Sequence, residues 1–201
     1  DKCPVATFEQ RVGKQLSIML WYQSMEEGRN FAEIQDVRKN YWGIDYDGKY
    51  RFLIYGWLPV ISTAEWASGA LDEYMISYFS EVASKEVRDM GPIWFRPANE
   101  MNGSWTPYYG DPQTYVKAWR RMYNIAEQLG VTQYNVFVWS PNYVSMPDKE
   151  SNAMTAYYPG DIYVDWLGVS LYPPSLSAQY PEDLRYPYTS IEHILKVSEN
   201  K

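Results

Sequence analysis

Residues 91–105 read GPIWFRPANEMNGSW, a short apolar run that ends abruptly in Arg96, Asn99 and Glu100. An apolar run of this length that starts after Gly91 is typical of a buried β-strand. In α/β folds, the polar residues that follow a strand lie where ligands bind. The stretch therefore predicts a strand with Glu100 at its end as a candidate proton donor. The competing interpretation is a solvated carboxylate in a surface loop, which is the usual situation of Glu.

Four other short apolar runs have the same character and are predicted strands as well. They lie at residues 16–22, 51–57, 134–140 and 165–172. The helices predicted around and between them cover residues 5–13, 29–40, 69–87, 111–129 and 189–200. Strands that are apolar throughout and separated by helices are typical of a parallel sheet covered by helices.

A parallel sheet of this kind either closes into a (β/α)-barrel or stays open as a doubly wound sheet, and the strand pattern allows both. No Gly-rich phosphate loop follows any of the predicted strands. This absence disfavours the nucleotide-binding, doubly wound alternative. We therefore expect an α/β fold of the barrel type, with residues 1–201 in a single domain.

The helix at 111–129 has the strongest boundary signals. Asp111 is a predicted N-cap, Pro112 fits the first turn, and Gly130 is a predicted stop. The predicted buried face of this helix consists of Val116, Trp119, Tyr123, Ala126 and Leu129.

Charge and composition exclude several classes of partner. The formal net charge is -7, which argues against a nucleic acid or an anionic membrane, because both need clustered Lys and Arg. No run reaches the roughly 18 consecutive apolar residues of a spanning helix. Cys3 and His193 are the only residues of their types, which weakens a disulfide, a metal centre or a histidine-dependent mechanism. We expect a soluble monomer without metal or other cofactor.

The chain is rich in aromatic residues, with 20 Tyr, 9 Trp and 6 Phe. Part of this excess belongs to the core, but Trp and Tyr also stack on the apolar faces of sugar rings. The predicted strand ends carry Trp57, Glu100, Trp139 with Asn142, and Tyr172. Since strand ends meet at one mouth of a barrel, we expect a neutral ligand such as a carbohydrate there.

Three segments give the chain a resemblance to a known family. They read FRPANEMNGSW at 95–105, VWSPN at 138–142 and YYPGDIYVDWLG at 157–168. With these segments the chain resembles glycoside hydrolase family 26, within the clan of retaining (β/α)8-barrel glycosidases. The similarity covers most of the chain from about residue 50 onward. It implies a (β/α)8 TIM barrel, present as an incomplete chain of about strands 2 to 6, and an endo-acting retaining β-glycanase.

The resemblance implies that Glu100 is the general acid/base. It would protonate the glycosidic oxygen in a first step and deprotonate the attacking water in a second. To hold a proton near neutrality its pKa must be high, and we expect burial among Trp94, Trp105 and Trp139 to raise it.

The resemblance also implies residues that bind substrate. Asn99 would hydrogen-bond the sugar, Arg96 would hold the local carboxylate geometry, and Tyr172 would bond the nucleophile. Trp105 and Trp139 would be sugar-stacking platforms. The complete predicted set is Trp57, Arg96, Asn99, Trp105, Trp139, Asn142 and Tyr172.

Two features depart from the family pattern. Asn99 stands where mannanases of the family usually have His, so a mixed-linkage β-glucan or a xylan competes with mannan as substrate. The family's nucleophile Glu ends barrel strand seven. If the chain holds about strands 2 to 6, it stops before that strand. We therefore expect the nucleophile to lie outside residues 1–201. Asp165 precedes its strand and is expected at the opposite, stability face of the barrel.

The leading hypothesis is a secreted endo-β-glycanase that acts on plant-type polysaccharide, with β-1,4-mannan as the first substrate. A β-1,3-1,4-glucanase and a xylanase are the alternatives of the same class. The competing class is a non-catalytic carbohydrate-binding module that keeps the aromatic cleft. A metabolic barrel for phosphorylated ligands has little support, because the chain is acidic and lacks a Gly-rich phosphate site.

Overall fold

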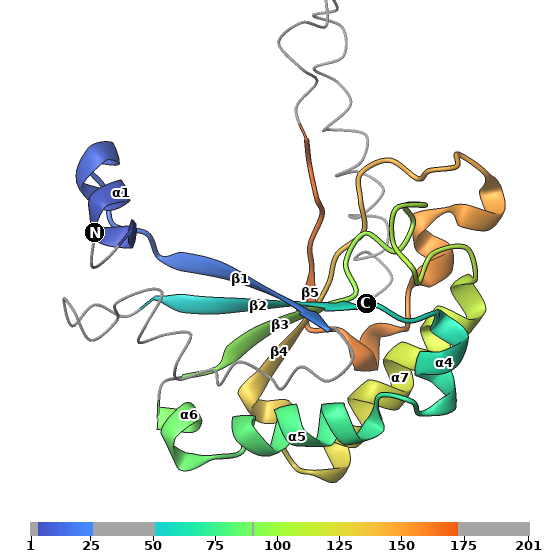
Figure 1. Cartoon of the computed structure of the whole chain (residues 1–201), viewed down its shortest axis with the longest axis horizontal. Helices are drawn as coiled ribbons and strands as arrows, with labels where there is room; N and C mark the ends of the chain where they lie inside the picture. The colour runs from blue at the N-terminus through green and yellow to red at the C-terminus, as the bar shows by residue number, and fades with distance from the viewer. Residues whose placement is uncertain (1–3, 26–50, 90, 173–201) are drawn as a thin grey trace, which may run out of the picture.

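The computed structural model describes residues 4–25, 51–89 and 91–172. These residues form a parallel sheet with helices packed on one of its faces (Figure 1). Helix α1 (Pro4–Val12) confirms the helix predicted at 5–13. The helices predicted at 29–40 and 189–200, together with Cys3 and His193, lie outside the described residues.

The sheet contains five strands within the described ranges, and each lies beside its neighbour in sequence. The strands are β1 (Ile18–Met25), β2 (Phe52–Pro59), β3 (Ile93–Pro97), β4 (Asn135–Trp139) and β5 (Trp166–Leu167). Every neighbouring pair is parallel. This confirms the predicted parallel sheet, and its sequential order favours the barrel, because a doubly wound sheet reverses its strand order.

β5 is shorter than the run predicted at 165–172. Beyond it, Gly168 N donates to Trp139 O at 2.8 Å, and Ser170 forms an isolated bridge with Asn142. The chain thus stays beside β4 without a regular ladder, which brings Ser170 to the end of β4. Asp165 precedes β5 and accepts a hydrogen bond from Phe137 N at 2.8 Å, in agreement with the expected structural role.

The helices differ from the predicted ones in number. They are α4 (Thr63–Ser68), α5 (Asp72–Val82), α6 (Lys85–Asp89) and α7 (Pro112–Gln128), with short 3-10 turns η2 (Thr132–Tyr134), η3 (Glu150–Asn152), η4 (Met154–Tyr157) and η5 (Asp161–Tyr163). The single helix predicted at 69–87 is two helices, α5 and α6. α4 was not predicted, although Ser62 and Glu65 form a complete capping box at its start.

The odd-numbered residues of β2, β3 and β4 face the helices and form the core. Leu53, Tyr55 and Trp57 of β2 are fully buried. Tyr55 lies against Tyr78 of α5, and Trp57 lies edge-on against Trp66 of α4. Figure 1 shows α4, α5 and α7 together on this side of the sheet.

The even-numbered residues face the other side of the sheet and line a hollow of about 430 Å³, which we call the barrel hollow. The strand residues that line it are Leu20, Tyr22, Ile54, Trp94, Arg96, Val138, Trp166 and Leu167. Most of this lining is apolar, as expected for the inner face of a barrel. Arg96 is the exception, and it stands at the end of β3 nearest to Glu100.

α7 begins as predicted, but its buried face is rotated. Asp111 is the N-cap, and Thr114 N donates to its Oδ1 at 3.1 Å. The buried residues of the helix are Tyr115, Ala118, Trp119, Met122 and Ala126. Leu129 is 41% exposed, so its predicted burial is wrong. On the observed face, the Tyr115 hydroxyl donates to a buried acceptor, Ala98 O, at 3.1 Å.

Replacing Asp111 by Ala should lower the free energy of unfolding by about 1 kcal/mol at neutral pH, because the N-cap bond is lost. Hydrogen bonds from Thr114 lower the pKa of Asp111. The contribution is therefore complete above the ordinary pKa of Asp and disappears as the pH falls through the lowered value. Denaturant titrations of both proteins at neutral and at strongly acid pH measure this difference.

Asp111→Asn is the matched control, since Asn also caps helices. It should keep the neutral-pH free energy of unfolding to within a few tenths of a kcal/mol. It should also abolish the part of the pH dependence that Asp111 contributes. Equal stability of Asp111→Ala and the native protein at neutral pH would contradict the N-cap.

Candidate active site

The carboxyl end of β3 carries an unusual backbone turn. Ala98 has a φ of 45° and Glu100 a φ of 60°, in the left-handed region that non-glycine residues avoid. Each such residue costs of order 1–3 kcal/mol and persists only where other contacts hold it. Ala98 N donates to Trp57 O at 2.7 Å, and Glu100 N donates to Ser140 O at 2.9 Å. The strained turn is thus fixed between the ends of β2 and β4.

Glu100 receives hydrogen bonds from two segments besides its own. Trp105 Nε1 donates to Oε2 at 2.9 Å, and the Tyr172 hydroxyl donates to Oε1 at 3.0 Å. Ser170 and Asn142 are further side-chain donors close enough to lower the pKa of this carboxylate. The structure therefore gathers Trp105, Asn142 and Tyr172 around Glu100. Tyr172, predicted to bond the nucleophile, bonds Glu100 instead in the described structure.

Two opposing effects act on the pKa of Glu100. Partial burial raises it, while hydrogen bonds from Ser170, Tyr172, Trp105 and Asn142 lower it. Together these donors outweigh burial, and the pKa lies below the ordinary value of Glu. The predicted rise in pKa is therefore wrong for the described residues. The reason is that Ser170, Tyr172, Trp105 and Asn142 all present donors to the carboxylate, with the largest effect from Ser170.

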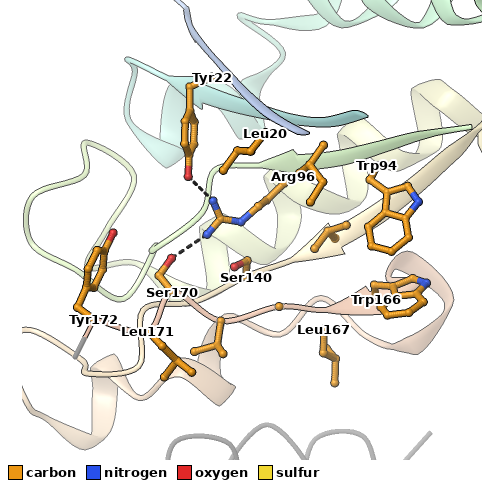
Figure 2. Close-up of a pocket in the computed structure, with 14 residues that line it drawn as sticks. Leu20, Tyr22, Trp94, Arg96, Ser140, Trp166, Leu167, Ser170, Leu171 and Tyr172 are labelled. Carbon is orange, nitrogen blue, oxygen red and sulfur yellow. Dashed lines mark hydrogen bonds between the residues drawn. The ribbon is translucent and has the colours of Figure 1, made fainter. Parts of the chain in front are cut away.

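Arg96 is buried between two hydroxyl groups (Figure 2). Its guanidinium donates to the Tyr22 hydroxyl and, at 2.7 Å, to Ser170 Oγ. Because Arg can only donate, Ser170 accepts this bond and keeps its own proton for Glu100. Tyr22, Gly56 and Arg96 stand in one row across β1, β2 and β3. A Cβ at Gly56 would lie 2.6 Å from the Tyr22 ring, so glycine is what lets Tyr22 reach across β2.

Trp105 packs directly on the backbone of Gly103. A Cβ on Gly103 would lie 2.2 Å from the indole ring. The residue remains 54% exposed, and Ser104 N ties its loop to Met146 O at 2.9 Å. The indole thus forms part of an open hollow of about 490 Å³, which we call the cleft. The cleft is lined by Glu100, Trp105, Asn142, Tyr143, Val144, Met146 and Tyr172.

Asn102 joins the loops that follow β3 and β4. It is fully buried, accepts from Asn142 N at 2.8 Å and donates to Asn142 O at 2.9 Å. Asn152 donates to Asn102 O at 2.9 Å, and its Oδ1 accepts from the Tyr157 hydroxyl at 2.6 Å. This network holds Asn142 beside Glu100. Asn102 lies within residues 91–105, but only its long-range partners distinguish it from an ordinary loop residue.

Sequence comparison identifies the family to which this site belongs. The pattern of glycosyl hydrolase family 26 matches residues 60–195, well over half of the chain. The chain belongs to glycosyl hydrolase family 26.

Two relatives share sequence with this family 26 chain. Mannan endo-1,4-beta-mannosidase A and B of Caldalkalibacillus mannanilyticus is 36% identical over 100 residues, which cover 44% of this chain and 18% of the relative. Endoglucanase H of Acetivibrio thermocellus is 31% identical over 87 residues, which cover 40% of this chain and 9% of the relative. The matched segments are therefore small parts of both proteins.

Solved structures share the fold of this family 26 chain. GH26C from Muricauda sp. superposes with a TM-score of 0.69 at 15% identity, over 96% of this chain and 60% of that one. Bacillus subtilis mannanase BCman superposes with a TM-score of 0.62 at 18% identity, over 84% of this chain and 57% of that one. The chain spans less than two thirds of either structure. The predicted fold class, a TIM barrel present as an incomplete chain, is confirmed.

Two of the substrate-binding residues predicted for this family 26 site are not accessible. Trp57 and Trp139 have no exposed surface. Trp139 lies edge-on against Tyr158, with the two ring centroids 5.3 Å apart. The prediction that they contact sugar is wrong, because odd-numbered residues of β2 and β4 face the helices. Asn99 lies next to Glu100 and is also buried, and its Oδ1 has no hydrogen-bond partner among the described residues.

The described ranges, residues 4–25, 51–89 and 91–172, also lack two features. No group of three or more His, Cys, Asp and Glu side chains in them could hold a metal ion. None of the helices in the same ranges is long and apolar enough to cross a membrane.

Replacing Trp105 by Phe should raise the pKa of Glu100 toward its ordinary value, since the ring remains but the Nε1 donor is lost. A ¹³C NMR titration of the Glu100 carboxyl group measures the change. Trp166→Phe is the control, because Trp166 lies in the barrel hollow against Trp94 and should leave the Glu100 titration unchanged. An unchanged pKa in Trp105→Phe would show that the indole N–H does not stabilise the carboxylate.

Proposed function

We propose that the protein containing this chain is an endo-acting β-glycanase that cleaves β-1,4-mannan by double displacement, with retention of configuration. The observation that supports the proposal is the setting of Glu100. It is a carboxylate at the carboxyl end of a barrel strand, on a strained turn, among four side-chain donors and beside an open cleft. Catalytic residues of TIM barrels lie at this end of the strands, and backbone strain clusters at active sites.

In the proposed first step, Glu100 gives its proton to the glycosidic oxygen while a second carboxylate attacks the anomeric carbon. The bond from that carbon to the leaving oxygen breaks, and Glu100 becomes an anion. Trp105 and Tyr172 donate to its two oxygens at 2.9 and 3.0 Å. They are therefore placed to stabilise the negative charge as it forms. The donors that lower the pKa of Glu100 thus favour release of its proton.

In the proposed second step, Glu100 takes a proton from water as that water attacks the anomeric carbon and releases the second carboxylate. Before the first step, a negative charge about 5–5.5 Å away would raise the pKa of Glu100. This repulsion offsets the donors and allows Glu100 to hold its proton. Glu100 is the only carboxylate among the described residues that line the barrel hollow and the cleft. We retain the prediction that the nucleophile lies outside residues 1–201.

The choice of mannan rests on the mannosidase from Caldalkalibacillus mannanilyticus, the more similar of the two relatives described above. The endoglucanase among the relatives and the Asn at position 99 support a mixed-linkage β-glucan as the alternative, with xylan as a third. The exposed indole of Trp105 offers a stacking surface for a sugar ring of any of these polymers.

We further propose that the chain forms one catalytic-type barrel domain of a monomeric, secreted protein. The supporting argument is the polymeric substrate, which is too large to enter a cell and has to be met outside it.

Replacing Glu100 by Gln should lower kcat on β-mannan about 10²- to 10⁴-fold, because the proton donor is lost while the shape of the side chain is kept. Binding should persist, since no group that contacts the remote sugars changes. Reducing-sugar release measures turnover, and affinity electrophoresis in galactomannan gels measures binding. Parallel assays on β-1,3-1,4-glucan and xylan decide among the proposed substrates.

The matched control is Glu127→Gln, which changes an exposed carboxylate of α7 and should leave turnover and binding as they are. Full turnover by Glu100→Gln would remove Glu100 from the mechanism. A native protein that binds one of these polymers but cleaves none of them would favour the carbohydrate-binding module.

A further inference from the structure

Two buried tyrosines donate hydrogen bonds to the strained turn from the side of the helices. The Tyr115 hydroxyl donates to Ala98 O at 3.1 Å, and the Tyr108 hydroxyl donates to Asn99 O at 2.8 Å. Tyr115 belongs to α7, and Tyr108 lies in the loop that leads to it. Both side chains are almost completely buried. Two successive carbonyl groups, between the two left-handed residues, are thus held by side chains.

These hydrogen bonds complete the attachment of the turn. Its amides, Ala98 N and Glu100 N, are held by the main chain at the ends of β2 and β4. Its carbonyls depend on the two hydroxyl groups, because α7 supplies no backbone donor to them among the described contacts. The main-chain bonds follow from the sheet, whereas the tyrosine bonds depend on side-chain identity. A phenyl ring would fill the same space but would leave Ala98 O and Asn99 O without these donors.

We propose that Tyr108 and Tyr115 are positioning residues, which hold Ala98 and Glu100 in the left-handed region and so aim the Glu100 carboxylate into the cleft. Without them the turn relaxes toward ordinary φ values, which are lower in energy for non-glycine residues. Relaxation rotates Glu100 away from Trp105 and Tyr172, whose donors meet its oxygens only in the present geometry. The consequence for turnover rests on the proposed function, but the consequence for the Glu100 side chain does not.

The two hydroxyl groups remain donors at any pH at which the protein is active. Burial raises the pKa of Tyr108, and the negative charge of Glu100 raises it further. Burial also raises the pKa of Tyr115, with Tyr108 adding to the effect. Neither tyrosine therefore ionises in the working range, and the support they give to the turn does not depend on pH.

The test compares Tyr108→Phe and Tyr115→Phe with Tyr78→Phe in the full-length protein. Tyr78 is the matched control: it is also fully buried, and its hydroxyl donates to Asn135 Oδ1 at 3.2 Å, at the opposite end of β4. All three variants lose one buried hydroxyl and should lose a similar amount of thermal stability. Thermal melts establish that each variant is folded at the assay temperature.

Tyr108→Phe and Tyr115→Phe should each lower kcat about tenfold to a hundredfold with KM within about twofold, because a misplaced proton donor slows chemistry more than binding. The ¹³C titration of Glu100 should move to higher pH in both variants. Tyr78→Phe should change neither kcat nor the titration. If Tyr115→Phe does not fold, Tyr108→Phe decides by itself.

The proposal is overturned if Tyr108→Phe keeps both the kcat and the Glu100 titration of the native protein. It is also overturned if Tyr78→Phe loses kcat to the same extent, since the effect would then reflect general destabilisation. A native protein without β-glycanase activity would refute the proposed function alone. In that case the Glu100 titration in the three variants still decides whether the tyrosines position the carboxylate.

Discussion

The arrangement of the site depends on one backbone constraint, the left-handed turn at Ala98 and Glu100. Without this turn, β3 would continue out of the sheet in extended form with alternating side chains. The Glu100 side chain would then point to the same face as those of Trp94 and Arg96. The turn breaks this alternation at the point where the strand leaves its neighbours. Its amides donate to carbonyl groups at the ends of β2 and β4, and its carbonyls accept from Tyr108 and Tyr115. The sheet therefore determines the orientation of a side chain that is no longer part of it.

Around the turn, the supporting contacts come from the segments that follow three different strands. Ser170 arrives from beyond β5, Asn142 from the loop after β4, and Trp105 from the loop after β3. Asn102 joins the loop after β3 to the loop after β4. The row of Tyr22, Gly56 and Arg96 holds the segment beyond β5, because Arg96 donates to Ser170. Polar side chains of β1 and β3, and of the segments that follow β3, β4 and β5, thus form the surroundings of Glu100. β2 contributes the space left by a glycine.

Much of this architecture could be predicted from local sequence. The apolar runs located all five strands, Asp111 located the start of α7, and the abrupt end of one run singled out Glu100. Local patterns failed where a fully apolar strand does not reveal which of its faces points inward. For this reason the strand-end pattern predicts Trp57 and Trp139 as substrate-binding residues, although both belong to the core.

Other features had no local signal at all. The positive φ values fall on Ala98 and Glu100, whereas sequence rules associate such values with glycine. Ser170 and Asn102 acquire their roles only through partners many residues away. The direction of the Glu100 pKa shift depends on how many donors, led by Ser170 and Tyr172, reach the carboxylate, which only the three-dimensional structure reveals.

Arg96 acts on the pKa values of two tyrosines to which it forms no hydrogen bond. Its guanidinium is buried, and among the described residues its hydrogen-bond partners are the two neutral hydroxyls of Tyr22 and Ser170. Its positive charge therefore acts over a longer range and opposes the rise in the pKa values of Tyr108 and Tyr172, while Glu100 contributes to that rise. A change of charge at Arg96 would thus shift the titration of groups that it does not touch.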